Sequence, residues 1–356
     1  MSKKYNLLLA GPVNVSQKVK EALQYPEIGH REEEFQILYS SIRKQLLKVF
    51  RANHKEHHIV VISGSGTAAM ESVISSLKKT SILFLTNGTF GDRLRDLGKL
   101  HGHNVIEYNA GVESLNLVEI ERILNNNKTI RYISIVHCET STGRLNPIDR
   151  IKQLAQKYKK KLIIDAMSSL GAEKFTMAGV DICFSNTNKS IEGVPVLSFV
   201  CTRKDAMNEL REIGRCFYLD LRRYIGYSEK NQTPYTPAIP LFFSLSQSLD
   251  EILREGVSNR ILRYKKRTAY FKNNLLKLGL NIRVKEKQEQ SNVCSFFSFP
   301  PHTNPKNLFK FLRTHGFIIY PSRYSKLEAQ ISWLASTPKK EIDRFISLLK
   351  EFLKRS

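Results

Sequence analysis

The sequence predicts an α/β protein with a mostly parallel sheet, helices on both of its faces, and a smaller C-terminal α+β domain. Short apolar runs rich in Val and Ile alternate with helical patterns over roughly residues 17–245. A chain of 356 residues is also too long for one small core. We therefore expect an N-terminal segment (1–16), a large domain (17–250), and a linking helix with a small domain (251–356).

Seven apolar runs are expected to form the large sheet, and each ends in small or polar residues. They read HHIVVISGS, TSILFLTNG, HNVIEYNA, IRYISIVHCE, KKLIIDAMS, VDICFSNTN and PVLSFVCTR. Helical patterns such as GTAAMESVISSLKK, FGDRLRDLGKLHG and IDRIKQLAQKYKK lie between several of them. Strands joined by helices predict a mostly parallel sheet, and ligands of such sheets bind at the carboxyl ends of the strands.

The C-terminal part begins with a long helical pattern over about residues 250–278. Three strand candidates follow, SNVCSFFSF, GFIIYPS and AQISWLA. The last helix is expected to have Thr337 as its N-cap and Pro338 as its first residue. Its buried face recurs at helical spacing and consists of Ile342, Phe345, Ile346, Leu349, Phe352 and Leu353.

Composition narrows the class of protein. The 56 Lys and Arg exceed the 33 Asp and Glu by 23 charges, but they are spread along the chain without a nucleic-acid-binding motif, so we expect no nucleic-acid partner. We expect neither a membrane span nor a signal peptide. The cysteines are odd in number and lack CxxC spacing, which favours a cytoplasmic protein without disulfides or a metal site. They are Cys138, Cys183, Cys201, Cys216 and Cys294.

Three groups of residues suited to binding or catalysis follow predicted strands. SGSGT (63–67) is a Gly-rich turn that opens a helix, where backbone N–H groups can bind a phosphate. Asp165 ends an apolar strand, where a carboxylate is costly unless it is paired, caps a helix or is catalytic. Lys189, in SNTNKSIEGVP, follows another strand and read alone would be a surface lysine. Each signal by itself is weak.

Together the three groups match the needs of pyridoxal phosphate. A lysine bonds to its aldehyde, a carboxylate keeps its pyridine nitrogen protonated, and a helix N-terminus holds its phosphate. Phe90, after a fourth strand, could stack on the ring. The sequence therefore predicts a pyridoxal phosphate enzyme.

Six motifs then resemble, in this order, the class V aminotransferases of fold-type I. They are LLLAGPVNVS, GHREEEF, SGSGTAAMES, VHCETSTGRLNP, LIIDAMSSLGA and NTNKSIEGVP, and the resemblance covers almost the whole chain. The motifs look more like those of 2-aminoethylphosphonate–pyruvate transaminases than those of alanine–glyoxylate aminotransferases. The resemblance implies a homodimer that moves an amino group between a small-molecule donor and an oxo-acid acceptor.

The resemblance also implies roles for individual residues. Lys189 would be the Schiff-base lysine and proton shuttle, and Asp165 would pair with the pyridine nitrogen. The remaining cofactor contacts would be to phosphate (Ser65, Gly66, Thr67, Asn188) and to the ring (Phe90, Ser141, Met167). Thr236, in the loop TPYTP, would complete the phosphate site of the neighbouring subunit.

One position departs from the family. EAQISWLA carries Gln330 where the family has an arginine that clamps the acidic group of the substrate, and a glutamine supplies no charge. Arg144, Arg323 and Arg31 are candidate replacements, although each is more readily read as a surface residue. Trp333, nearby, is expected to pack within the small domain.

The expected reaction converts 2-aminoethylphosphonate and pyruvate to phosphonoacetaldehyde and alanine. Because of Gln330, a related transaminase that uses alanine and glyoxylate, or another aminophosphonate, remains an alternative. A basic binding protein derived from the family is a third possibility, but the joint presence of Asp165 and Lys189 favours an enzyme.

Overall fold

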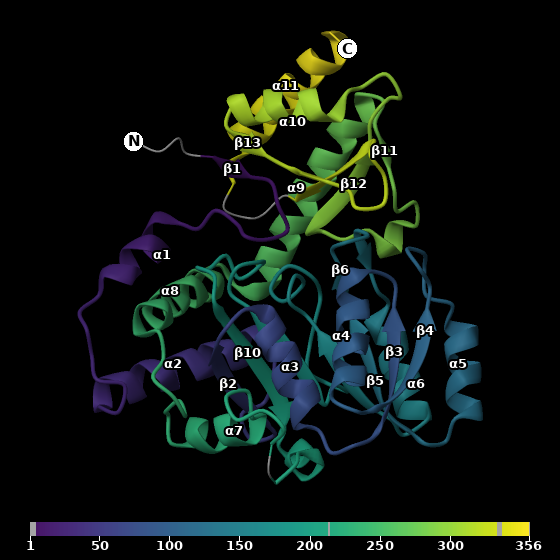
Figure 1. Cartoon of the computed structure of the whole chain (residues 1–356). Coiled ribbons are helices and arrows are strands. Elements are labelled where there is room, and N and C mark those ends of the chain that lie inside the picture. Colours follow the sequence, from purple (N-terminus) through teal and green to yellow (C-terminus); the bar gives the residue numbers. More distant parts are fainter. Residues whose placement is uncertain (1–4, 213, 333–336, 356) are drawn as a thin grey trace.

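The structure is a computed structural model that describes residues 5–212, 214–332 and 337–355. Its large sheet has seven strands in the order β2-β10-β9-β8-β5-β3-β4 (Figure 1). All seven predicted strands are confirmed. They are β2 His57–Ser63, β3 Ser81–Thr86, β4 Asn104–Asn109, β5 Ile130–Val136, β8 Lys161–Asp165, β9 Ile182–Asn186 and β10 Leu197–Arg203.

Six of these strands run in one direction. β10 is antiparallel to β2 and β9, and the other neighbouring pairs are parallel. The carboxyl ends of the six strands therefore meet at one edge of the sheet, where ligands of such folds bind.

Helices cover both faces of the sheet, as predicted. Along β2, Ile59 and Val61 belong to one core, whereas Val60 and Ile62 belong to the other. This alternation follows from the two-residue period of a strand. The first core includes side chains of α2 Glu33–Phe50, α5 Leu117–Asn126, α6 Ile148–Lys157 and α8 Ile239–Glu255. The second includes side chains of α3 Gly66–Ser76, α4 Thr89–Leu100 and α7 Leu221–Glu229.

The expected single helix over 250–278 was wrong. The structure has α8, which ends at Glu255, and α9 Val257–Lys277, with Gly256 between them. Gly256 has a φ of 81°, a left-handed conformation that ends a helix and that only glycine adopts at little cost. Its N–H bonds the carbonyls of Ile252 and Leu253.

The C-terminal part has its own antiparallel sheet, in the order β11-β12-β15-β14. Its strands and helices are β11 Asn281–Ile282, β12 Cys294–Ser298, β14 Tyr320–Pro321, β15 Glu328–Ser332, α10 Pro305–Thr314 and α11 Lys339–Arg355. Except for β14, which is exposed, these elements share a core with Phe271 and Leu275 of α9. The N-terminal segment joins them through β1 Asn6–Leu7, which pairs with β13 Phe317–Ile318 (Figure 1).

The last helix begins at Lys339, one residue later than predicted. The carbonyl of Pro338 accepts from the N–H groups of Glu341 and Ile342. The predicted inner face is confirmed, because all six of its side chains belong to the C-terminal core or pack against it. Trp333 lies outside the described residues.

The remaining elements are short. They are α1 Gln17–Glu21, η1 Ala22–Gln24, β6 Cys138–Glu139, β7 Arg144–Leu145, η2 Lys204–Glu209 and η3 Lys287–Glu289. Among the helices of the described ranges, none combines the length and the hydropathy needed to span a membrane.

Candidate active site

A cavity opens at the edge where the carboxyl ends of the strands meet. Of the ten residues predicted to contact a cofactor, eight line this cavity. They are Ser65, Gly66, Thr67, Phe90, Asp165, Met167, Asn188 and Lys189. The chain segments that follow β2, β3, β8 and β9 bring them together, because the strands run in the same direction.

The start of α3 forms one side of the cavity. Ser65 is the N-cap, and its side chain makes no capping hydrogen bond. The first N–H groups of a helix have no partner within the helix, so they can bind an anion. Gly66 packs closely, since a Cβ there would lie 2.1 Å from Sδ of Met167, whose side chain would have to move. The loop therefore offers backbone donors, with the hydroxyls of Ser65 and Thr67 beside them.

Asp165 supplies a buried carboxylate at the end of β8. Its Oδ1 accepts a hydrogen bond from the N–H of Met167 at 2.8 Å. Burial raises the pKa of Asp165 to about 7, a shift that the Met167 N–H and the charge of Lys189 partly oppose. A cationic ligand atom beside this carboxylate would be strongly favoured.

Lys189 extends into the same cavity from the turn after β9. Its Nζ lies 4.8 Å from the centre of the Phe90 ring. The N-terminal segment passes close by, because a Cβ on Gly11 would lie 2.9 Å from Cγ of Lys189. Asn186, on the same strand end, has a buried Oδ1 without a hydrogen-bond partner among the described residues. The cavity thus combines an amine, an aromatic face and an unsatisfied acceptor.

Glu139 is a positioning residue that the sequence did not single out. Its buried carboxylate accepts from the N–H groups of Phe90 and Gly91, both at 3.1 Å, at the start of α4. It also accepts from Oγ of Ser141 at 2.6 Å. Burial raises the pKa of Glu139, and these donors oppose the shift. Ser141 lines an adjoining cleft rather than the inner cavity.

Arg93 is the second residue that the sequence did not single out. Its NH1 donates to Oγ1 of Thr67 at 3.0 Å, and its guanidinium carbon lies 5.2 Å from the centre of the Phe90 ring. Arg93 lines both the cavity and the adjoining cleft. The available signal was its position three residues after Phe90, on the same face of a predicted helix.

Thr236 and Arg31 lie elsewhere. Thr236 is exposed and does not line the cavity of its own chain. Arg31 donates to the carbonyl of Thr233 at 2.8 Å, and its guanidinium lies 5.5 Å from the centre of the Tyr227 ring. Within this chain, Arg31 therefore supports the loop that carries Thr236 and does not line the substrate cleft.

The suggestion that Arg144 replaces the family arginine is corrected by the structure. Arg144 is buried, and its guanidinium pairs with Glu113 at 2.8 Å, Glu289 at 2.5 Å and Glu286 at 3.3 Å. Its charge is used within the fold, because three carboxylates surround it. The sequence could not show this, since the three acids come from distant segments.

Gln330 and Arg323 both line the adjoining cleft. The side-chain amide of Gln330 donates to the carbonyl of Thr140, so it binds the protein itself. Arg323 is exposed and lies on the loop after β14. The structure thus keeps Arg323 as a candidate and places it beside Gln330.

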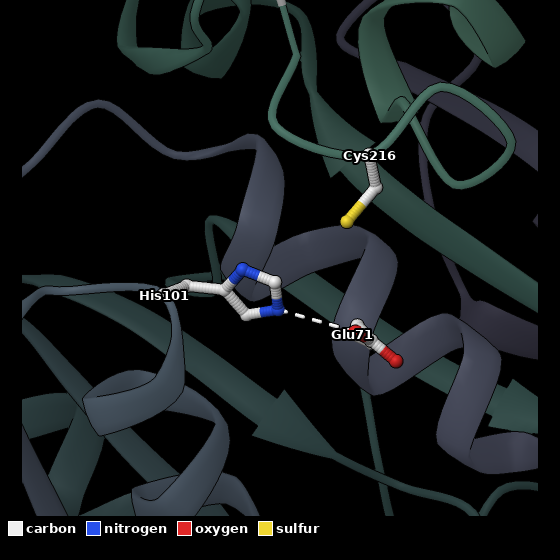
Figure 2. A group of neighbouring side chains, drawn as sticks. All are labelled: Glu71, His101 and Cys216. Carbon is white, nitrogen blue, oxygen red and sulfur yellow. Dashed lines mark hydrogen bonds and ion pairs between the residues drawn. The ribbon is translucent and has the colours of Figure 1, made fainter.

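One group of metal-ligating side chains lies outside the cavity (Figure 2). Glu71, His101 and Cys216 place their ligand atoms within 4.8 Å of one another, and Nε2 of His101 lies 3.2 Å from Oε1 of Glu71. The positive charge of Arg215 acts near Cys216, which opposes a cation. We assign the group no role beyond the contact between imidazole and carboxylate. Sequence spacing could not reveal it, because its members come from three separate elements.

The inner cavity fits pyridoxal phosphate on four structural grounds. The N-terminus of α3 suits the phosphate, and the buried Asp165 suits a protonated ring nitrogen. Phe90 offers a face to the ring, and Lys189 offers an amine to the aldehyde.

Comparisons with known proteins agree with this geometry. The family model "Aminotransferase class-V" matches residues 13–320. A 2-aminoethylphosphonate–pyruvate transaminase of Bacillus cereus is 31% identical, and the match covers 97% of both chains. A bifunctional phosphonoacetaldehyde hydrolase/aminoethylphosphonate transaminase of Clostridioides difficile is 29% identical over 99% of this chain, which spans only 57% of that relative. The crystal structure of an alanine–glyoxylate aminotransferase from Nostoc sp. superposes with a TM-score of 0.92 at 25% identity, covering 99% of this chain and 96% of the other.

The family match spans most of the chain, and the solved aminotransferase from Nostoc sp. shares its fold. The chain therefore belongs to the class V aminotransferases, which depend on pyridoxal phosphate.

Proposed function

We propose that the protein transfers an amino group from 2-aminoethylphosphonate to pyruvate, giving phosphonoacetaldehyde and alanine. Relatives that are 30–31% identical over 96–97% of this chain carry this activity in their names. The observation that carries the proposal is that Lys189, Asp165 and the start of α3 line one cavity. This cavity opens into a cleft lined by cationic side chains. Transamination of alanine with glyoxylate or of another aminophosphonate is the second candidate, favoured by Gln330.

The roles of the cavity residues follow from their chemistry. Ser65, Thr67 and the N–H groups at the start of α3 would hold the phosphate, with Asn188 beside them. Asp165 would keep its charge against a protonated ring nitrogen, because that cation offsets the cost of burial. Phe90 and Met167 would contact the ring.

Bound pyridoxal phosphate supplies an aldehyde and an electron-withdrawing ring, which together make the C–H bond next to the substrate amine acidic. Lys189 would first hold the cofactor and, once the substrate amine has displaced it, act as a base at that carbon. Nζ of Lys189 would hold the proton taken from that carbon and deliver it on the cofactor side, and a water molecule would supply the carbonyl oxygen of phosphonoacetaldehyde as the amino group stays behind. In the second half-reaction, pyruvate would take the amino group along the reverse path.

We further propose a homodimer, in which Thr236 reaches the phosphate site of the partner. An exposed aromatic cluster beside Thr236 supports this arrangement. Tyr235 stacks on Tyr218 at 4.8 Å and lies 5.8 Å from Phe217, and Phe217 is 70% exposed. Exposed apolar side chains that cluster in this way are typical of interfaces between proteins. The five free cysteines, four of them buried, support a cytoplasmic location.

Single half-reactions test the proposed substrate. Purified protein with bound cofactor is mixed with 2-aminoethylphosphonate or with alanine, and loss of the visible absorption band of the cofactor is recorded. We expect both donors to remove the band, because alanine is the product of the reverse half-reaction. If alanine removes it and 2-aminoethylphosphonate does not, the phosphonate assignment is wrong.

A further inference from the structure

The side chains that line the cleft next to the inner cavity carry a net positive charge. The cleft shares Phe90, Arg93, Thr140 and Lys189 with the cavity, so it continues the cavity outwards. Its lining contains three cations, Arg93, Lys189 and Arg323, and no carboxylate among the residues that the structure describes. Since Lys189 is committed to the cofactor in the proposed function, the two arginines are the charges left for a substrate.

Arg93 is held at the inner end of the cleft. It is half-buried on α4, where the Thr67 hydroxyl and the Phe90 ring fix its guanidinium. No carboxylate in the described ranges forms an ion pair with it, whereas Arg95, two residues later, pairs with three. The charge of Arg93 acts on the buried Asp165 through space, but no carboxylate of the described residues is bonded to the guanidinium directly, so an anionic ligand would supply that partner.

Arg323 is held at the outer end of the cleft. Its loop meets the start of α4 where the hydroxyl of Tyr324 lies 3.4 Å from Oγ1 of Thr89. Ser322, the residue before Arg323, accepts from the guanidinium of Arg283 at 2.8 Å. Arg323 itself forms no ion pair with a described residue. The loop is thus fixed on both sides, while the Arg323 side chain remains available.

Gln330 supplies no charge to bind the anion of a substrate, so the two arginines are the candidates for this task. It occupies the position where the family resemblance leads one to expect the substrate-clamping arginine, and its amide is used on the Thr140 carbonyl. We infer that Arg93 and Arg323 form the anion subsite of the substrate in place of that arginine. The inference rests on the proposed function and adds the residues that select its substrate.

The two substrates place their anions differently. In alanine the carboxylate is attached to the reacting carbon, whereas in 2-aminoethylphosphonate the phosphonate lies one carbon further away. Arg93 lines the inner cavity as well as the cleft, so we assign it to both anions. Arg323, at the outer end, favours the longer phosphonate, to which a guanidinium can donate two hydrogen bonds. Selection of the phosphonate over alanine therefore depends mainly on Arg323.

The test compares Arg323→Ala, Arg323→Lys and Arg93→Lys with wild type in both half-reactions. Arg150→Ala is the matched control, since Arg150 is an exposed arginine on α6 that lines neither the cavity nor the cleft. For Arg323→Ala we expect the Michaelis constant for the phosphonate donor to rise about 10- to 100-fold and that for alanine less than about threefold. Arg323→Lys should recover part of the loss, because it restores charge but not the paired donors.

Arg93→Lys should raise the Michaelis constants for both donors while the cofactor stays bound, as measured by its dissociation constant. Equal effects of Arg323→Ala on the two donors would overturn the role of Arg323. A change in cofactor affinity alone in Arg93→Lys would make Arg93 a cofactor residue and overturn its role in the subsite.

Binding of ethylphosphonate, measured by calorimetry on the holoenzyme, separates this inference from the proposed function. If wild type fails to react with 2-aminoethylphosphonate but binds ethylphosphonate more tightly than Arg323→Ala does, the substrate assignment fails and the subsite stands. If wild type reacts and both arginine variants behave like Arg150→Ala, the subsite is wrong and the assignment stands.

Discussion

The side chain of Gln330 and the backbone of Thr140 are joined by a hydrogen bond that links β15 of the C-terminal sheet to the segment after β6. We expect Gln330→Ala to lower the free energy of unfolding by about 1 kcal/mol, because a partly buried hydrogen bond is lost. Urea unfolding against Gln153→Ala, an exposed glutamine on α6, measures the effect. An unchanged urea midpoint would show that the bond contributes nothing.

Arg144→Ala should reduce stability without affecting substrate binding. Removing a buried cation leaves Glu289 without its partner, and we expect a loss of about 3 kcal/mol. Glu113→Gln serves as the comparison, since this exposed partner should contribute at most about 1 kcal/mol. Thermal unfolding and the Michaelis constant for the amino donor are measured together. A large rise in that constant with unchanged stability would return Arg144 to the substrate site.

Asp165→Asn should stabilise the cofactor-free protein at high pH. The pKa of Asp165 is about 7 when folded against an ordinary 3.8, so the folded state binds its proton more tightly than the unfolded state. Its contribution therefore lowers the free energy of unfolding as the pH rises from about 4 to about 7. At pH 8 we expect the variant to be about 2–4 kcal/mol more stable than wild type.

The catalytic activity of Asp165→Asn should fall by about 100-fold or more, because the substitution removes the charge opposite the ring nitrogen. Glu173 also has a pKa raised to about 7 by burial, but it is present in both proteins and cancels in the comparison. Equal pH dependence of unfolding in the two proteins would contradict the buried, costly state of Asp165.

Gly66→Ala should block the cofactor cavity, since the added Cβ would lie 2.1 Å from Sδ of Met167. We expect the dissociation constant of pyridoxal phosphate to rise at least about tenfold, because the ends of the Met167 and Asn186 side chains, which both line the cavity, have to move to make room for the Cβ. Adding Met167→Ala removes the obstructing sulfur and should restore part of the affinity. If the double variant is as weak as the single one, packing is not the reason for this glycine.

Phe217→Asp should shift the proposed dimer towards monomer, because it places a charge in the exposed aromatic cluster beside Thr236. Light scattering across a dilution series measures the mass, and cofactor affinity is followed in the same samples. The affinity should fall with the dimer fraction. A variant that is monomeric and still binds the cofactor normally would rule out a contribution of Thr236 from the partner.

Much of the site was predictable because strand ends are visible in the sequence. Asp165 and Lys189 follow apolar runs that alternate with helices, and parallel strands bring such ends together. The Gly-rich turn at 63–67 was readable for the same reason, since a helix follows it at once.

Other features depend on contacts between distant segments. Arg144 looks like any arginine until Glu113 and Glu289 are brought to it from 31 residues before and 145 residues after. Arg93 reaches the cavity only in the folded chain, where α4 lies against α3. Gly256 was overlooked because the helical pattern continues on both sides of it, and only its φ of 81° reveals the break.

The central claim is that Lys189 holds the cofactor, and covalent trapping tests it most directly. Wild-type holoenzyme is treated with borohydride, digested and analysed by mass spectrometry. We predict a pyridoxyl phosphate group on the peptide that contains Lys189, and its absence after the same treatment of Lys189→Ala. A trapped group on another lysine, or none in a wild-type protein saturated with cofactor, would contradict the account.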